Sequence, residues 1–144
     1  MAEAAINKEF KHKVAKYLEG RLSTNCDTCG VCSSSCPVHQ YVPGFDPRKF
    51  VRMISLGYKD ELLGSTAIWY CALCNTCTVV CPQDVRFKQI MEVLQKVAIA
   101  EGYVPPSFVD ELRKIEQECQ AYRCEQIASR LLASSSKLKK TEVK

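Results

Sequence analysis

Eight of the ten cysteines fall into two copies of one spacing. Both copies read C-x2-C-x2-C-x3-C-P, and the second lies 45 positions after the first. The first copy contains Cys26, Cys29, Cys32 and Cys36, and the second contains Cys71, Cys74, Cys77 and Cys81. Cysteine runs of this spacing hold cubane iron–sulfur clusters through their thiolates. We therefore expect two [4Fe–4S] clusters, and with them one-electron chemistry.

The two copies are expected to exchange one ligand each. A C-x2-C-x2-C segment can wrap three corners of a cube, so the fourth iron needs a thiolate from elsewhere. In two-cluster ferredoxins the cysteine before the proline ligates the other cluster. The predicted first set is Cys26, Cys29, Cys32 and Cys81, and the predicted second set is Cys71, Cys74, Cys77 and Cys36. Such an exchange would hold the two clusters close to each other.

Other uses of these cysteines fit the pattern less well. Structural zinc takes four ligands, often as two separated C-x2-C pairs, and here the third cysteine and the C-P ending are surplus. A disulfide framework suits a short secreted chain, whereas this chain begins with polar and charged residues. A purely structural pair of clusters is also disfavoured, because one cluster would suffice as a staple. We expect a reducing, cytoplasmic and anaerobic setting.

The composition excludes several classes of function. No run approaches the roughly 20 apolar residues of a membrane-spanning helix. The formal net charge of +4 suggests nucleic-acid binding, but eight thiolates carrying two clusters would bring it to about zero. The basic end of the chain, with Lys137, Lys139, Lys140 and Lys144, is expected to be solvated. No acid–base pair, nucleophile or phosphate loop is evident, so no catalytic residue is predicted.

Helical segments surround the two copies. Apolar residues recur at helical spacing from residue 5 to about 20, from 85 to 101 and from 107 to 132. Asp46 and Pro47 predict the start of another helix, whose inner face is Phe50, Val51 and Ile54. No alternating strand pattern is present. We predict an all-α fold, a ferredoxin-like module with a pseudo-two-fold repeat around two cubane clusters.

These segments divide the chain into four expected regions. Residues 1–20 are an N-terminal amphipathic helix, and residues 21–105 are the α-helical domain with two [4Fe–4S] clusters. Residues 106–132 are a C-terminal helix, and residues 133–144 are a disordered basic tail.

The chain resembles the C subunits of heterodisulfide reductases, a family built on the α-helical ferredoxin domain. The resemblance rests on the two cysteine motifs about 45 residues apart, the segment 69–74 (Trp-Tyr-Cys-Ala-Leu-Cys), the helix after Pro82 and the short length. It covers roughly residues 20–105. The same domain occurs in the iron–sulfur subunits of succinate dehydrogenases and in the C subunit of glycerol-3-phosphate dehydrogenase. We expect neither a plant-type ferredoxin domain before it nor a CCG domain after it, which favours the heterodisulfide reductase resemblance.

The resemblance implies a role in an oxidoreductase complex. The C subunit of that family relays electrons between the A subunit, which carries flavin and iron–sulfur clusters, and the B subunit, which reduces the disulfide at CCG motifs. A hydrogenase or dehydrogenase could be reached through the A subunit. This chain has no adjacent Cys–Cys pair and is not expected to be catalytic alone. The alternatives are a diffusible two-cluster ferredoxin and the electron-transfer component of a fumarate-reductase-like or glycerol-3-phosphate-dehydrogenase-like complex.

Some residues near the motifs have expected supporting roles. Trp69 and Tyr70 precede a ligand and are expected to shield a cluster from water. His39 is not expected to be a ligand, because four cysteines are already present in each set. Cys119 lies on the apolar stripe of the last helix and is expected to be buried as a small hydrophobe or to contact a partner. Cys124 lies too far around that helix to form a disulfide with it.

Overall fold

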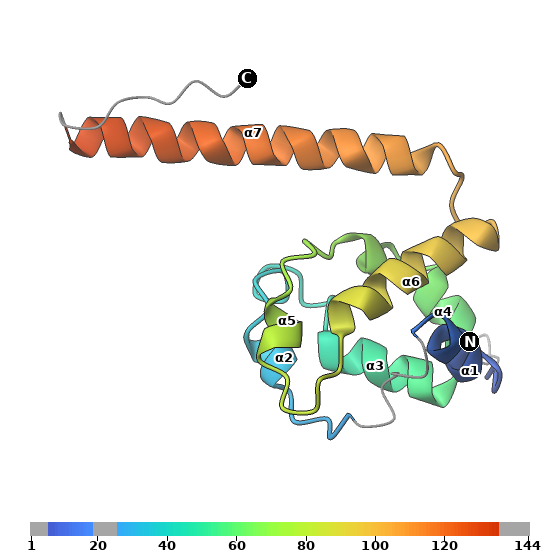
Figure 1. Cartoon of the computed structure of the whole chain (residues 1–144). Helices are drawn as coiled ribbons and strands as arrows, with labels where there is room; N and C mark the ends of the chain where they lie inside the picture. The colour runs from blue at the N-terminus through green and yellow to red at the C-terminus, as the bar shows by residue number, and fades with distance from the viewer. Residues whose placement is uncertain (1–5, 19–25, 136–144) are drawn as a thin grey trace. The chain divides into compact units, whose positions relative to one another are not determined.

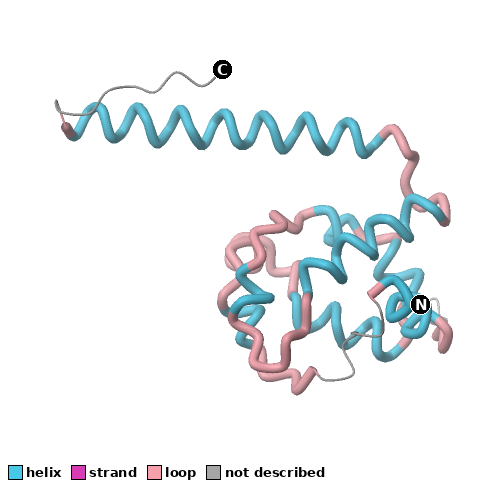
Figure 2. The backbone as a smooth tube through the Cα atoms, in the orientation of Figure 1, coloured by secondary structure: helices cyan, strands magenta, loops and turns pink. Residues whose placement is uncertain are grey.

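The computed structural model describes residues 6–18 and 26–135. Within these ranges the chain is helical and has no strand, which confirms the all-α prediction (Figure 2). The elements are α1 (Phe10–Tyr17), α2 (Val31–Ser34), α3 (Pro47–Leu56), α4 (Lys59–Leu63), the 3₁₀ helix η1 (Thr66–Trp69), α5 (Thr76–Val79), α6 (Phe87–Ala100) and α7 (Phe108–Ser134). The chain divides into two compact units, Met1–Val104 and Pro105–Lys144.

The first helix is shorter than the sequence pattern predicts. It begins at Phe10 instead of residue 5, because the residues before it form a turn. The backbone N–H of Asn7 donates to Gly57 O at 2.8 Å, and the Asn7 side chain accepts from the Glu9 N–H at 3.0 Å. These bonds hold residues 7–9 away from helical geometry. Phe10 and Val14 are the buried residues of α1, and the predicted positions 1–5 and 19–20 lie outside the described residues.

Helix α3 has the start and the inner face that its sequence predicts. The Asp46 carboxylate accepts from the Lys49 N–H at 3.2 Å, and Pro47 occupies the first helical position, where its missing N–H costs nothing. Gly57 ends the helix with φ at +83°. A Cβ at Gly57 would lie 2.5 Å from Asn7 O, so both the backbone angle and the close approach of the turn before α1 require glycine.

Helix α6 supplies the largest part of the core. Seven of its residues are buried: Phe87, Ile90, Met91, Val93, Leu94, Val97 and Ala98. The helix contacts α1, α4, α5 and η1, while α3 packs against α1, α2 and α4 (Figure 1). Short helices α2 and α5 contact each other at the end of the unit where the cysteines lie. The long helices therefore form a scaffold from which the two cysteine loops extend.

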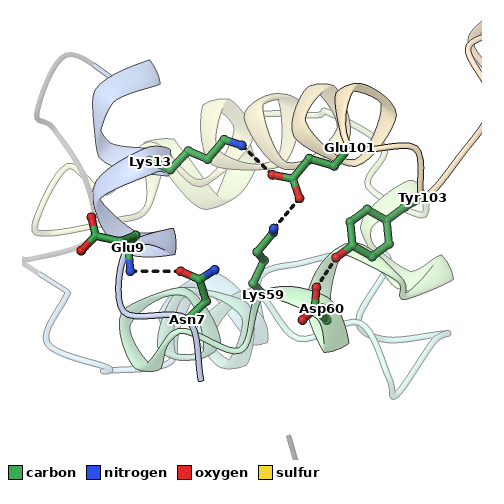
Figure 3. Close-up of polar contacts among 7 residues, drawn as sticks. All are labelled: Asn7, Glu9, Lys13, Lys59, Asp60, Glu101 and Tyr103. Atoms are coloured by element: carbon green, nitrogen blue, oxygen red, sulfur yellow. Dashed lines mark hydrogen bonds and ion pairs between the residues drawn. The ribbon is translucent and has the colours of Figure 1, made fainter. Parts of the chain in front are cut away.

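Ionic and polar contacts fasten the far end of α6 (Figure 3). Glu101 accepts from Lys13 Nζ and from Lys59 Nζ, both at 2.5 Å, and so joins α1 and α4 to the end of α6. The Tyr103 hydroxyl donates to the Asp60 carboxylate. Partial burial raises the pKa of Glu101, but the two lysines more than offset it, so this pKa lies below its ordinary value.

Helix α7, which makes up most of the second unit, has no buried residue. Its apolar side chains follow two different faces. Leu112, Ile115 and Cys119 share one side, whereas Ile127 and Leu131 lie about 90° or more around the helix from the centre of that side, at about 100° per residue. Among the described residues no helix is long and apolar enough to cross a membrane.

Candidate metal centre

The two cysteine loops have the same local backbone. Thr28 and Leu73, which are 45 positions apart, have φ of 56° and 49°. Gly30 and Asn75, again 45 apart, have φ of 84° and 67° and precede the four-residue helices α2 and α5. Positive φ is rare for a residue with a side chain, and most of all for a β-branched one such as Thr28. Both loops thus have the same backbone conformation, and in both it includes strained residues with positive φ.

The loops enclose two cavities, each lined by cysteines from both copies. Cys77 lines both cavities. The other cysteines of the first cavity are Cys26, Cys29, Cys32 and Cys81, and those of the second are Cys36, Cys71 and Cys74. The structure therefore brings all eight predicted ligands to the two cavities. All ten cysteines are free thiols.

The remaining lining of these cavities is mostly apolar. Phe87 lines both cavities and Phe45 lines the second, with the two rings edge-to-face at 6.4 Å between centroids. Phe50 packs against Phe45 at 5.2 Å. Phe45 and Phe87 are almost fully buried. Such a lining lowers the local polarity around a redox group and thereby tunes its potential.

The state of the thiols fits a metal group. Burial raises the pKa of Cys71 to about 11, and burial is also the main cause of the raised pKa of Cys32 and of Cys77. A thiol with a raised pKa keeps its proton at neutral pH unless a cation compensates the charge, and metal coordination deprotonates it. Cys74, exposed at the rim, has a lowered pKa, mainly because the Thr76 hydroxyl hydrogen-bonds to its sulfur. This donor set therefore suits cationic iron.

Hydrogen bonds reach some of these sulfurs from the protein. The Val85 N–H donates to Cys81 Sγ at 3.3 Å. The Thr76 hydroxyl lies 3.3 Å from Cys74 Sγ. Gln83 Nε2 donates to Asp27 Oδ2 at 2.5 Å and so ties the segment after the second loop to the first. Donors aimed at cluster sulfurs are a means by which a protein sets a reduction potential.

The sequence expectation for Trp69 and Tyr70, the two residues before the second motif, is wrong. Neither Trp69 nor Tyr70 lines a cysteine cavity, and the Tyr70 hydroxyl instead donates to Thr66 Oγ1 at 3.1 Å. Phe45 and Phe87 occupy the shielding positions, because α6 and the turn before α3 lie closer to the cavities than η1 does. Cys119 is exposed on α7, so its expected burial is not found among the described residues, and its contact with a partner stays a prediction.

The remaining residue considered near the motifs has a structural part. His39 Nδ1 donates to Phe45 O at 2.7 Å, and His39 lines neither cavity. This bond holds the turn that carries Phe45.

Sequence reasoning also missed Arg48, which lines the first cavity. Its Nη1 lies 3.2 Å from where a Cβ on Gly30 would be, so the glycine leaves room for the guanidinium. Lys88, which lines the second cavity, lies 3.6 Å from Glu92 in an ion pair. Each basic residue is the second of its helix, α3 or α6. A basic residue near the start of the helix that follows each motif was the signal that could have found them.

Comparisons with known proteins agree with this geometry. The family described as "4Fe-4S dicluster domain" matches residues 25–86, which contain both cysteine copies. That match confirms the predicted cofactors, two [4Fe–4S] clusters, which the eight thiols at the two cavities fit.

Curated relatives are C subunits of archaeal enzymes. The chain is 31% identical over 102 residues, 71% of its length and 54% of the relative's, to the C subunit of the H(2):CoB-CoM heterodisulfide,ferredoxin reductase of Methanothermobacter thermautotrophicus. It is 39% identical over 77 residues, 54% of its length and 40% of the relative's, to the second iron–sulfur C subunit of the CoB–CoM heterodisulfide reductase of Methanocaldococcus jannaschii.

A third relative comes from Archaeoglobus profundus and is described as similar to heterodisulfide reductase C subunits. It is 28% identical over 103 residues, which are 72% of this chain and 55% of the relative. The chain spans about half the length of the curated relatives it matches.

Proposed function

We propose that this chain is the electron-transfer subunit of a heterodisulfide-reductase-like complex. Its residues 25–86 match the 4Fe–4S dicluster domain family, and the chain is similar to heterodisulfide reductase C subunits. The observation that carries the proposal is the pair of adjoining cavities lined by eight thiols. No protein residue on the described part of the chain forms an acid–base or nucleophilic constellation around them. The chain would move electrons and leave the bond-breaking chemistry to a partner.

The proposal includes the exchanged ligand sets. Cys81 lines the first cavity with Cys26, Cys29 and Cys32, and this supports its place in the first set. Cys36 lines the second cavity with Cys71, Cys74 and Cys77, and this supports the second set. The contact of α2 with α5 brings the two copies close enough for such an exchange. Cys77 lines both cavities, so the two clusters would be neighbours.

The residues around the cavities have definable tasks in this proposal. When bound, each [4Fe–4S] cluster supplies a one-electron redox couple. Phe45 and Phe87 would exclude water and keep the medium between the cavities apolar. Cys29 and Cys74 are exposed, so they mark the sides where a partner's redox group could approach. The Gln83–Asp27 bond would hold the two loops in register.

The partners follow from the similarity to C subunits. We infer that the chain receives or donates electrons at a flavin-containing A subunit and at a B subunit with CCG motifs, with a hydrogenase or dehydrogenase reached through the A subunit. The relatives' names place them in heterodisulfide reductases, which supports the presence of other subunits. Ligand thiols persist in reducing compartments, so the proposal places the complex in the cytoplasm.

Anaerobic purification of the full chain from its native cells tests the proposal. The expected result is about eight irons per chain and a co-purifying flavoprotein with a cysteine-rich partner. Iron at about half that amount would contradict the two-cluster assignment. A fully loaded chain that elutes alone at every salt concentration would instead make it a diffusible ferredoxin. Zinc at the same thiols would overturn the redox role altogether.

A further inference from the structure

Two equivalent hydroxyl residues follow the third cysteine of each copy. Ser33 follows Cys32, and Thr78, 45 positions later, follows Cys77. Their backbones make matching hydrogen bonds. The N–H of Ser33 donates to Gly30 O at 3.0 Å, and that of Thr78 donates to Asn75 O at 3.1 Å. The two hydroxyls therefore start from the same place relative to their cysteines.

The Ser33 hydroxyl already has two partners. It donates to Asp46 Oδ1 at 2.5 Å and accepts from the Arg48 N–H at 3.2 Å. Its only proton is thus used on a carboxylate, which is the strongest acceptor within reach. Cys32 Sγ lies 4.0 Å away and competes poorly for that proton.

The Thr78 hydroxyl has no such partner. Its Oγ1 is buried and forms no hydrogen bond of good geometry within the described part of the protein. The residue before α6 also differs from the residue before α3. Arg86 occupies the position that Asp46 has before α3, and a guanidinium can only donate. Buried hydroxyls without a hydrogen-bond partner are rare in native proteins, so the proton of Thr78 is available to a further acceptor.

Cys77 is the neighbour that can accept this proton. In the first copy the Ser33 hydroxyl lies 4.0 Å from Cys32 Sγ, and the matching backbone of the second copy gives the Thr78 hydroxyl the equivalent place beside Cys77 Sγ. The proton of Thr78 is not committed to a carboxylate, as that of Ser33 is. Sulfur becomes a thiolate when it binds iron, and a hydrogen bond to it then favours the more negative, reduced cluster.

We infer that the Thr78 hydroxyl donates a hydrogen bond to the Cys77 thiolate once Cys77 ligates a cluster, and thereby raises the reduction potential of that cluster relative to the other. The inference rests on the proposed function, since it needs two clusters. Thr78 is a positioning residue that acts through Cys77, and its counterpart Ser33 does not act in the same way on Cys32. The two clusters would be inequivalent because Asp46 accepts the Ser33 proton, whereas no described residue accepts that of Thr78.

Redox titration of the reconstituted full chain, followed by electron paramagnetic resonance, tests the inference. Thr78→Val keeps the shape and removes the proton, so we expect the potential of one cluster to fall while the other stays unchanged. Thr78→Ser restores the proton and is expected to restore the potential. Ser33→Ala is the matched control and is expected to shift the first cluster less than Thr78→Val shifts the second. Cys74→Ser, which perturbs the second set, assigns the signals.

The outcomes separate this inference from the proposed function. A wild-type chain with fewer than about eight irons means that the proposed function fails. Full iron and two signals, with equal potentials in wild type and Thr78→Val, would overturn the hydroxyl's role alone. Should Thr78→Val not load, double resonance of the reduced wild-type protein in H2O and D2O decides. It should show an exchangeable proton coupled to the second cluster that persists in Thr76→Val, which lacks the hydroxyl beside Cys74, and absence of that proton would overturn the inference.

Discussion

The first cysteine loop, residues 26–36, and the second, residues 71–81, share a spacing and a backbone but differ in their surroundings. Ser33 of the first loop is bonded to Asp46, and Arg48 lies over Gly30. In the second loop Asn75 takes the glycine position, and Thr78 has no acceptor among the described residues. The repeat thus duplicates the ligands, while residues outside it give each copy a different electrostatic environment.

The loops also differ in how the following helix is held. Helix α3 is joined to its loop directly, because Asp46 accepts both from Ser33 and from the α3 backbone. Helix α6 has no side-chain cap at its start and is fastened at its other end by Glu101. The two cysteine motifs are therefore equivalent, but the contacts that hold the helix after each motif are not. The two loops should therefore respond differently to substitutions at equivalent positions.

The largest effect is expected from Cys81→Ser. If Cys81 belongs with the first loop, this variant loses or weakens the first cluster, and iron falls from about eight towards about four per chain. Iron analysis and electron paramagnetic resonance measure the loss. Cys36→Ser should remove the other signal, and Cys119→Ser, which changes a thiol on α7, should keep full iron. Loss of the second signal in Cys81→Ser would mean that each loop completes its own ligand set.

Ser33→Ala should be the next largest change. It removes a 2.5 Å bond to a carboxylate that is partly buried, at an expected cost of about 1.5–3 kcal/mol in the free energy of unfolding. Urea unfolding of the loaded chain measures the cost. Ser34→Ala is the neighbouring control, since Ser34 only bonds to Val31 O on the surface. Equal midpoints for the two variants would contradict the anchoring of α3 by Ser33.

Gly30→Ala and Asn75→Gly should change stability in opposite directions. Both sites have positive φ, where an alanine costs about 1–2 kcal/mol and glycine costs least. Gly30→Ala also brings a Cβ to 3.2 Å from Arg48 Nη1, whose long side chain can yield. Thermal unfolding followed by circular dichroism compares the two. A lower melting temperature for Asn75→Gly than for wild type would show that the Asn75 side chain itself stabilises the second loop.

The smallest effect concerns the far end of α6 and depends on pH. Because the pKa of Glu101 is lowered in the folded chain, its contribution to stability is present above its ordinary pKa of 4.5 and is lost as the pH falls through the folded value. Glu101→Gln should therefore lower the melting temperature more at about pH 6.5 than at about pH 4. Glu116→Gln on α7 is the control. If Glu101→Gln lowered the melting temperature equally at both pH values, the ion pairs of Glu101 would not be the cause of that loss.

Much of the fold could be predicted from local patterns. Asp46 with Pro47 marks the start of α3, and the apolar spacing of α6 gives its buried face, because caps and helical periodicity are local in the sequence. The start of α1 was predicted wrongly. The hydrogen bond from the Asn7 N–H reaches Gly57 O, 50 positions along the chain. The local spacing of apolar residues cannot predict a contact over that distance.

Thiol spacing and apolar periodicity lie within short segments, so they were enough to predict the cysteine ligands and to identify the cofactor and the helical class. Only the tertiary structure decided what surrounds each cavity. It placed Phe45 and Phe87 where Trp69 and Tyr70 were expected, and it gave Ser33 a carboxylate while leaving Thr78 without one. The physical reason is that polarity and hydrogen bonding at a buried site depend on which distant helix ends pack there, and no spacing rule encodes that packing.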